Sequence, residues 1–466
     1  MKRTYTIETN TCVGEKVQLS GWVATKRNHG KIVFIDLRDK KGIIQVVALS
    51  EQSIDKLKTE SVITVTGTVK KRPNHLQNKT SPTGSVEIEA EKIDILSLAQ
   101  DLPFAIEKDK GDVAEDVRLK YRYLDLRRSK MRNNLVMRAK MIQFLRQYLC
   151  KLDFTEVETP YLSKSTPEGA RDYLVPSRLQ SGHFYALPQS PQQYKQLLMV
   201  AGLEKYFQIV RCFRDEDTRG DRQAEFTQLD IELSFVENEE EILELIENMF
   251  TELVKKVFPQ KHITFNKWPR IAYNEAIAKY GSDKPDLRKD KNDPNELAFA
   301  FVIDFPMFEK TETGKLTAVH HPFTAPKIDG IEELKHDTMK IKAKQFDFVL
   351  NGYEVGGGSI RTHNPEILAR VFEILGHTKE EVNEQFGHLL EAFRYGVPPH
   401  GGIAPGIDRL IMLLQNEPNI REVIAFPKTG DGRDLMMSAP SIVAQEQLDE
   451  LGIKSIDKKI KKDRIR

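Results

Sequence analysis

Five short segments in the first hundred residues alternate apolar and polar side chains, and this pattern constrains the fold more than any other feature of the chain. Alternation with a period of two is typical of β-strands that are buried on one face. The segments are Val17–Thr25, Lys31–Arg38, Gly42–Leu49, Ser61–Val69 and Val86–Leu96. Between the third and the fourth, Gln52–Lys58 is a helix candidate. The N-terminal part should therefore form a small domain of five strands and one helix.

Five strands with a helix after the third are the pattern of an OB-fold barrel, a fold that binds single-stranded nucleic acid. Phe34 and Gln45 fall on the second and third expected strands, where an aromatic ring could stack on an unpaired base and an amide could read it. Alternation alone favours a different role for Phe34, as part of the barrel core. The role of Phe34 is therefore open at this point.

Charge is distributed unevenly along the chain, although its net value is only +1. Residues 1–100 hold 16 Lys and Arg against 11 Asp and Glu, and the remainder holds 54 against 58. A basic domain beside a more acidic one indicates that the basic domain meets a polyanion.

Other features argue against several classes of protein. No run of 18 apolar residues is present, so no membrane span is expected, and the N-terminus lacks the apolar stretch of a secretion signal. Cys12, Cys150 and Cys212 are far apart, without the spacing of a zinc site or a disulfide framework. Adjacent side chains such as His320 and His321 point in opposite directions on an extended chain, and no third ligand has metal-site spacing. We expect a protein of the reducing cytoplasm without zinc.

A charged hairpin is the first candidate for chemistry. Residues 208–213 and 226–235 are expected to form two strands, joined by a turn-rich basic loop. Arg214 can bind a phosphate in a planar fork, Glu216 can accept from an adenine amino group and Phe226 offers a face for stacking. The hairpin suits a nucleoside triphosphate, and a surface hairpin with solvated charges explains the same pattern equally well.

A turn followed by three glycines is the second candidate. One strand places Asp347 before the turn, and the returning strand brings Glu354 close to it. Two carboxylates on neighbouring strands suit Mg²⁺ that bridges phosphates. Gly356–Gly358 allow a ligand to approach the backbone closely, and Arg361 follows on the ligand side, although a bulge or tight bend would also explain the glycines.

Further signals set the expected domain boundaries. Apolar residues at helical spacing predict a helix over residues 133–151, and Phe154–Pro160 predicts a strand closed by proline. Gly401–Arg409 is a glycine-rich strand that feeds a helix, from which Arg409 can reach a triphosphate. The expected parts are an OB-fold domain over 1–104, a linker or hinge over 105–132, a large domain over 133–445 and a basic C-terminal extension over 446–466.

Together these motifs resemble the class II aminoacyl-tRNA synthetases, in particular the bacterial-type aspartyl family. The three class motifs are resembled by Phe154–Pro160, by Phe213–Glu216 with Phe226, and by Gly402–Arg409. The aspartate-specific signatures are resembled by Gln189–Lys195, His320–Thr324 and Gly352–Arg361. The resemblance covers nearly the whole chain and implies an α+β fold. It consists of a five-stranded OB-fold anticodon-binding domain and a class II catalytic domain built on an antiparallel sheet flanked by helices.

The resemblance implies an ATP-dependent ligase of protein biosynthesis, a cytoplasmic homodimer that converts L-aspartate to aspartyl-adenylate and transfers it to the 3' end of tRNA(Asp). It assigns L-aspartate binding to Glu168, Ser190, Gln192, Lys195, Arg214, Asp230, His320 and Arg361. It assigns ATP binding to Arg214, Asp215, Glu216, Gln223, Phe226, Glu354, Gly406, Ile407, Asp408 and Arg409. Mg²⁺ is assigned to Asp347 and Glu354, and catalysis to Arg214, Glu354 and Arg409.

On the tRNA side, the resemblance assigns the anticodon to Arg27, Phe34 and Gln45, and tRNA discrimination to His29 and Ser81. A histidine in the first barrel loop looks like the enzymes of this family that charge both tRNA(Asp) and tRNA(Asn). Charging of tRNA(Asn) is therefore a hypothesis as well.

The chain departs from the bacterial pattern at one place. Bacterial members usually carry a large extra domain between the second and third class motifs, whereas here Asp283–Arg288 is joined to Phe301 by only a dozen residues. The functions of that extra domain cannot be carried over to this chain.

Three alternatives share parts of the pattern. An asparaginyl-tRNA synthetase is disfavoured because Lys195 and Arg361 place two cations around a group that would be a neutral amide. A non-catalytic RNA-binding paralogue is disfavoured by the presence of Arg214, Glu354 and Arg409. An ammonia-dependent asparagine synthetase would lack the barrel. The same two cations should reject asparagine strongly, so no editing site is expected.

Overall fold

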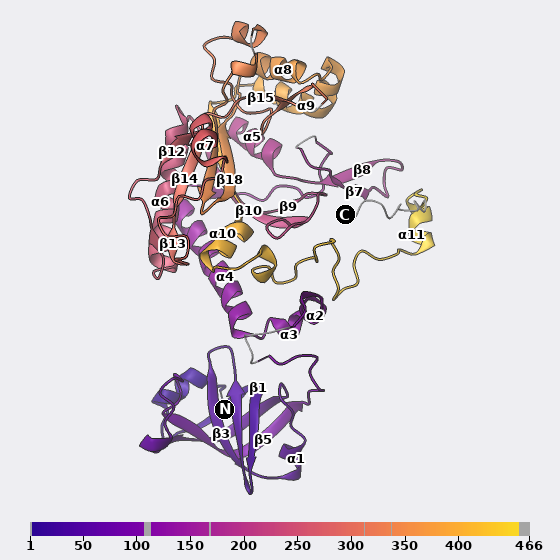
Figure 1. Ribbon diagram of the computed structural model, residues 1–466. Helices are drawn as coiled ribbons and strands as arrows, with labels where there is room; N and C mark the ends of the chain where they lie inside the picture. Colours follow the sequence, from indigo (N-terminus) through magenta and orange to yellow (C-terminus); the bar gives the residue numbers. More distant parts are fainter. Residues whose placement is uncertain (1, 107–112, 167–168, 312, 337, 456–466) are drawn as a thin grey trace. The chain divides into compact units, whose positions relative to one another are not determined.

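The computed structural model describes residues 2–106, 113–166, 169–311, 313–336 and 338–455. The chain divides into two compact units, Met1–Val113 and Ala114–Arg466 (Figure 1). The predicted linker over 105–132 therefore straddles this division. Its later part lies with the second unit because the buried guanidinium of Arg122 donates to the backbone carbonyls of Arg421 at 2.5 Å and Ile424 at 2.8 Å.

The first unit is a closed barrel with strand order β1-β2-β3-β5-β4, as the alternating segments predicted. Its strands are β1 (Lys16–His29), β2 (Ile32–Arg38), β3 (Ile43–Leu49), β4 (Val62–Lys71) and β5 (Val86–Ser97), and the short helix α1 (Gln52–Asp55) follows β3. Every second side chain of β2 points inward, so that Val33, Ile35 and Leu37 are fully buried. Burial of this one face holds the barrel together.

The second unit is built on an eight-stranded sheet with the order β12-β14-β17-β18-β19-β10-β9-β6. The strands are β6 (Thr155–Glu156), β9 (Lys205–Phe213), β10 (Glu225–Ser234), β12 (Arg270–Ala272), β14 (Phe299–Ile303), β17 (Gln345–Leu350), β18 (Tyr353–Ile360) and β19 (His400–Pro405). The strands from β14 to β9 pair antiparallel, and only the edge strands β12 and β6 pair parallel. The predicted antiparallel sheet is confirmed, although the predicted strand Phe154–Pro160 is realised only as the short edge strand β6.

Three helices pack on this sheet and supply its main core. They are α4 (Ser129–Cys150), α6 (Glu239–Val257) and α10 (Ile407–Leu414). The predicted stripe on α4 is buried at Met141, Leu145 and Leu149, and α4 lies beside α6 (Figure 1). Asn238 caps α6 by accepting from the backbone N–H of Glu240. The core therefore fixes the sheet from which the site residues project.

A second layer of helices covers the other end of this unit. It consists of α5 (Gln192–Val200), α8 (Pro365–Ile374) and α9 (Lys379–Phe393). Phe323, Phe372 and Phe386 pack together between these helices. This cluster anchors α5, which carries Gln192 and Lys195.

The remaining elements are short. They are η1 (Thr6–Thr11), η2 (Asn74–Leu76), α2 (Glu115–Lys120), α3 (Arg122–Asp125), β7 (Tyr173–Pro176), β8 (Phe184–Leu187), β11 (His262–Ile263), α7 (Tyr273–Tyr280), β13 (Glu296–Leu297), β15 (Phe308–Lys310), β16 (Leu316–Ala318), η3 (Ile331–Lys335), η4 (Thr338–Lys340), η5 (Ile420–Glu422) and α11 (Gln445–Glu450). In the part of the chain that the structure describes, no helix combines the length and the apolar character needed to cross a membrane.

Candidate active site

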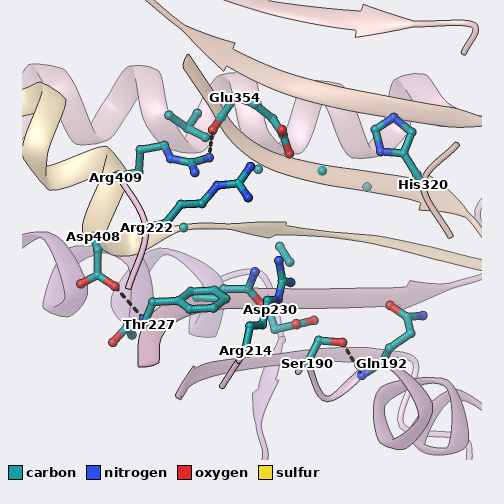
Figure 2. A pocket seen from close by; sticks show the side chains of 18 of the residues that line it. Ser190, Gln192, Arg214, Arg222, Thr227, Asp230, His320, Glu354, Asp408 and Arg409 are labelled. Atoms are coloured by element: carbon teal, nitrogen blue, oxygen red, sulfur yellow. Dashed lines mark hydrogen bonds between the residues drawn. The ribbon is translucent and has the colours of Figure 1, made fainter. Parts of the chain in front are cut away.

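A cavity of about 350 Å³ lies over β10, β18 and β19, between helix α5 and the start of α10. It brings together most of the site residues that the sequence predicted. They are Ser190, Gln192, Lys195, Arg214, Glu216, Gln223, Phe226, Asp230, His320, Glu354, Arg361, Gly406, Asp408 and Arg409. In Figure 2 Arg222 and Arg409 lie on the left of this cavity, His320 and Gln192 lie on the right, and Arg214 lies between them. We call the part around Arg214, Arg222 and Arg409 the arginine end, and the part around Gln192, Lys195, Asp230 and Arg361 the α5 end.

Three predicted residues do not line the cavity, and a fourth cannot be placed. Glu168 lies outside the described residues. Asp215 is not among the lining side chains, and one of its carboxylate oxygens lies 3.6 Å from Nε of Arg171. Ile407 is fully buried in the main core. Asp347 is buried and is not among the lining residues, although its Oδ1 accepts from the amide of Gln345, which lines the cavity, at 3.2 Å.

The arginine end presents cations that are only partly neutralised. The guanidinium of Arg214 lies 5.0 Å from the ring centroid of Phe226, and its buried Nε has no hydrogen-bond partner within the described ranges. Arg409 donates to the backbone carbonyl of Glu354 and lies 3.1 Å from a carboxylate oxygen of Asp221 (Figure 2). A planar guanidinium beside an aromatic ring suits a ligand that carries both a phosphate and a base.

Asp408 fixes the start of α10 against the sheet. One of its carboxylate oxygens accepts from the backbone N–H of Thr227 at 2.7 Å (Figure 2), and the other pairs with Arg138. Both carboxylate oxygens are thus engaged by protein groups. Within the predicted stretch Gly406–Arg409, Ile407 and Asp408 therefore hold α10 in place, and Arg409 is presented to the cavity.

The carboxylates of Asp347 and Glu354 meet across the glycine run. A Cβ atom added to Gly357 would lie 3.3 Å from Oδ1 of Asp347 and 3.9 Å from Oε1 of Glu354, so both carboxylates reach the same stretch of backbone. Burial, reinforced by the charge of Glu354, raises the pKa of Asp347 well above its usual value. His320 lies 3.8 Å from Asp347, and burial lowers the pKa of this imidazole. Two mutually repelling carboxylates fit a divalent cation, which would relieve their repulsion.

The α5 end is a closed network of buried charges. The ammonium of Lys195 lies 2.5 Å from Oδ1 of Asp230 and 3.1 Å from Oε2 of Glu232. The guanidinium of Arg361 donates to both oxygens of Glu232, at 2.9 and 3.1 Å, and to Oγ of Ser359 at 2.6 Å. Each of the two cations that the sequence assigned to the substrate carboxylate therefore also contacts a buried carboxylate of the protein.

The two carboxylates of this network differ in their surroundings. Burial raises the pKa of Asp230, whose Oδ2 has no hydrogen-bond partner in the described part of the chain. Burial would also raise the pKa of Glu232, but Arg361 and Lys195 lower it to about 2. Asp230 lines the cavity and Glu232 does not.

Glu232 and His321 are the residues that sequence reasoning missed at this end. Glu232 follows Asp230 by two residues on β10, so the period of two that places Asp230 on the cavity side places Glu232 on the same face. His321 lines the cavity beside His320, and burial together with the charges of Arg361 and Lys195 lowers its pKa to about 3. A neutral imidazole therefore stands beside the two cations.

Glutamine side chains line the cavity at both ends. Gln192 donates its backbone N–H to Oγ of Ser190 at 3.3 Å, and its side-chain amide donates to Gln196 at 3.0 Å (Figure 2). Gln223 at the opposite end accepts from the backbone N–H of Lys428, and its buried Nε2 has no partner among the residues described. These amides offer donors and acceptors for a polar ligand.

On the barrel, the predicted nucleic-acid residues lie together on the outer surface. Phe34 is half-buried on the outer face, and it is absent from the barrel core that contains Val33 and Ile35, so its assignment to that core is wrong. Arg27 pairs in register with Phe34, and its guanidinium lies 3.4 Å from Oε1 of Gln45.

The two residues assigned to tRNA discrimination lie apart on the barrel. His29, expected in the first barrel loop, is the last residue of β1 and pairs with Ile32. The ring of His29 makes an edge contact with Phe34 at 5.6 Å, so it belongs to the same surface as the predicted anticodon residues. The hydroxyl of Ser81 lies 3.3 Å from that of Thr83, between β4 and β5.

Comparison with family models gives a match for each unit. Residues 114–430 match the model described as tRNA synthetases class II (D, K and N), and residues 17–96 match the model described as OB-fold nucleic acid binding domain. Together the two matches account for most of the chain.

Similar proteins of known name span nearly the whole chain. The aspartate–tRNA(Asp/Asn) ligase of Rubrobacter xylanophilus is 41% identical over 570 residues, with 95% of this chain and 94% of that protein covered. The ligase of the same name from Dictyoglomus turgidum is 42% identical, with 97% of both chains covered. The alignment of 570 positions exceeds the 466 residues of this chain, so the Rubrobacter protein carries segments that this chain lacks.

Among solved structures, an asparaginyl-tRNA synthetase from Pyrococcus horikoshii complexed with asparaginyl-adenylate superposes with a TM-score of 0.74. It covers 92% of this chain and 98% of its own, at 24% identity. At 24% identity, the similarity shows a shared fold alone.

Proposed function

The chain belongs to the class II tRNA synthetases (D, K and N), and from this premise we propose that it is an aspartate–tRNA ligase. In the first step, the α-carboxylate of L-aspartate attacks the α-phosphate of ATP, and pyrophosphate leaves. In the second step, the terminal ribose of tRNA attacks the aspartyl-adenylate, and AMP leaves. The observation that carries the proposal is the meeting, in one cavity, of the arginine end with the charged network of the α5 end.

The charges of the α5 end, taken together with Arg214, favour aspartate as the amino acid. Lys195, Arg214 and Arg361 carry three positive charges, and Asp230 and Glu232 carry two negative charges. These five residues together have a surplus of one positive charge, which matches L-aspartate with its net charge of −1. Asparagine is neutral overall and would leave this charge unbalanced in a buried site.

Each group at the α5 end has a part in holding aspartate. Arg361 and Lys195 bind the side-chain carboxylate, with His320 close by. The ammonium group goes to Asp230, whose second oxygen is unpartnered in the described structure, with Ser190 and Gln192 beside it. Glu168 belongs to this ammonium side by resemblance. Aspartate is thereby oriented with its α-carboxylate toward Arg214.

At the arginine end, the protein neutralises charge rather than supplying a nucleophile. Arg214 binds the α-phosphate and the attacking carboxylate, and Arg409 binds the γ-phosphate. Phe226 stacks on adenine, Glu216 accepts from its amino group, and Gln223 is a further contact. Gly406 lines the cavity beside Arg409, Ile407 and Asp408 contribute by holding α10, and Asp215 is the remaining residue of the proposed ATP site.

Asp347 and Glu354 are the residues that would hold Mg²⁺. When bound, the ion would offset negative charge on the leaving pyrophosphate. In the protein alone, the two carboxylates raise the free energy of the empty site by repelling each other, which makes cation binding more favourable.

The barrel would bind the anticodon of tRNA(Asp) through Arg27, Phe34 and Gln45. Its outer position leaves the ring of Phe34 available for base stacking, which is worth about 1–3 kcal/mol per base. We also propose that tRNA(Asn) is charged, because His29 touches this same surface. Ser81 is the second residue proposed for discrimination.

A homodimer in the cytoplasm is the proposed form of the enzyme. Support comes from large side chains near the edge strand β6, where Leu152, Tyr161 and Leu162 are 39%, 43% and 53% exposed. A second copy that covers these side chains would remove apolar surface from water. Sedimentation analysis of the full chain tests this, and a monomer at micromolar concentration would rule it out.

The proposed function is tested by ATP–pyrophosphate exchange with aspartate or asparagine as the amino acid. We expect exchange with aspartate and almost none with asparagine. Charging of tRNA(Asp) and tRNA(Asn) transcripts is measured in parallel. Exchange that depends on asparagine would instead identify an asparaginyl enzyme, and exchange with neither would reject a synthetase role.

A further inference from the structure

Glu232 holds both cations of the α5 end without facing the cavity. Its carboxylate receives two hydrogen bonds from Arg361, at 2.9 and 3.1 Å, and lies 3.1 Å from the ammonium of Lys195. Its side chain is completely buried. Asp230 differs, because it lines the cavity and keeps an oxygen without a partner in the described ranges. Asp230 is therefore placed to touch a substrate, and Glu232 is placed to act through other residues.

The backbone beside Glu232 leaves room for this arrangement. Glu232 pairs in register with Gly402 on β19. A Cβ atom added to Gly402 would lie 2.1 Å from Oε2 of Glu232 and 2.0 Å from the carbonyl of Ile231. No side chain fits there without moving β10 or Glu232. Gly402, which the sequence placed in a class motif, therefore provides the space that the carboxylate occupies.

The geometry of Arg361 depends on Glu232. A guanidinium donates in fixed directions, and two donors of Arg361 are held by the two oxygens of one carboxylate. The hydroxyl of Ser359 accepts from a third nitrogen at 2.6 Å. An amide in place of this carboxylate would turn its own N–H donors toward Arg361 or Lys195, and at least one cation would lose its position.

We propose that Glu232 is a positioning residue that determines amino-acid specificity. It orients Arg361 and Lys195 toward the side-chain carboxylate of the substrate and offsets one of the two positive charges that these residues carry. This inference rests on the proposed aspartate-dependent function. It adds to the proposed aspartate site a residue that acts without touching the substrate.

The variant Glu232→Gln tests the inference, because glutamine has nearly the same volume and lacks the charge. We expect KM for aspartate in ATP–pyrophosphate exchange to rise about 10-fold or more, while KM for ATP stays within about twofold. The two KM values should respond differently because no residue of the arginine end contacts Glu232 in the described structure. Glu232→Asp keeps the charge with a shorter reach and should lie between Glu232→Gln and the wild type.

The order of these two variants separates positioning from packing. If Glu232 only filled space, the isosteric Glu232→Gln would behave better than the smaller Glu232→Asp. Glu247→Gln is the matched control, since Glu247 also holds an arginine, the partly buried Arg270, and does not line the cavity. We expect the control to leave both KM values unchanged. Thermal unfolding of every variant confirms that each assay measures folded enzyme.

Two outcomes would overturn the inference. One is a KM for aspartate in Glu232→Gln that stays within about twofold of the wild type. The other is a parallel rise of the KM values for aspartate and ATP. Failure of the proposed function is a different result, because wild-type enzyme would then show no exchange with aspartate at all.

Discussion

The two ends of the cavity hold their arginines in opposite ways. At the α5 end, Arg361 is 5% exposed and bound to both oxygens of Glu232. At the arginine end, Arg214 is half-buried beside Phe226 and makes no ion pair with any residue that the structure describes. The α5 end is thus organised before a ligand arrives, whereas the arginine end keeps charge available for one. Specificity should depend on the first arrangement and charge neutralisation on the second.

The strongest test of this contrast is Arg361→Leu. We expect it to abolish aspartate-dependent pyrophosphate exchange, because the side-chain carboxylate loses its main partner. We also expect it to lower the free energy of unfolding by about 3–5 kcal/mol, because Glu232 is left buried with one partner fewer. Exchange kinetics and urea unfolding measure the two effects. Arg270→Leu is a control that disturbs a partly buried ion pair elsewhere. Near-normal exchange in Arg361→Leu would disprove the assignment.

Arg214→Ala should separate activity from stability. We expect kcat for exchange to fall about 10²–10³-fold, because one group that neutralises developing charge is lost. The melting temperature should stay close to that of the wild type, since no ion pair of the described structure is broken. Steady-state kinetics and calorimetry decide the outcome. A large loss of stability would show that the arginine end is as organised as the α5 end.

The pH dependence of stability should reveal the lowered pKa of Glu232. Because its pKa is about 2 in the folded protein and 4.5 for a glutamate exposed to water, its contribution is complete above pH 4.5 and is lost as pH falls toward 2. The contribution is on the order of 3 kcal/mol. Urea unfolding at several pH values should show a steeper acid loss for wild type than for Glu232→Gln. Parallel curves would mean that Glu232 is not stabilised as an anion.

Asp347→Asn should give the smallest effect, with the opposite sign. Removing one of two repelling carboxylates should stabilise the Mg²⁺-free protein by about 1 kcal/mol at neutral pH. The same change should weaken the stabilisation by added Mg²⁺ with ATP. Melting curves with and without these ligands measure both results. A destabilised variant in the absence of Mg²⁺ would show that Asp347 has a structural role.

Local patterns in the sequence predicted most of the architecture. The period of two in residues 17–96 predicted the barrel. The helical spacing of apolar residues on α4 predicted its buried stripe. The motifs also placed most cavity residues correctly, because glycine runs and charged turns have local geometric causes. The role of Phe34 could not be decided from the sequence, because alternation alone does not show which face of a strand turns inward.

The sequence by itself determined the barrel, the antiparallel sheet and the identities of the groups that could meet ATP and aspartate. Only the tertiary structure decided how the charges are paired. Lys195 and Asp230 are 35 residues apart, and Glu232 and Arg361 are 129 residues apart. No local pattern predicts such contacts, because they form only when α5, β10 and β18 pack together and exclude water. Burial makes each unpaired charge costly, so the folded pocket pairs Lys195 and Arg361 with Asp230 and Glu232.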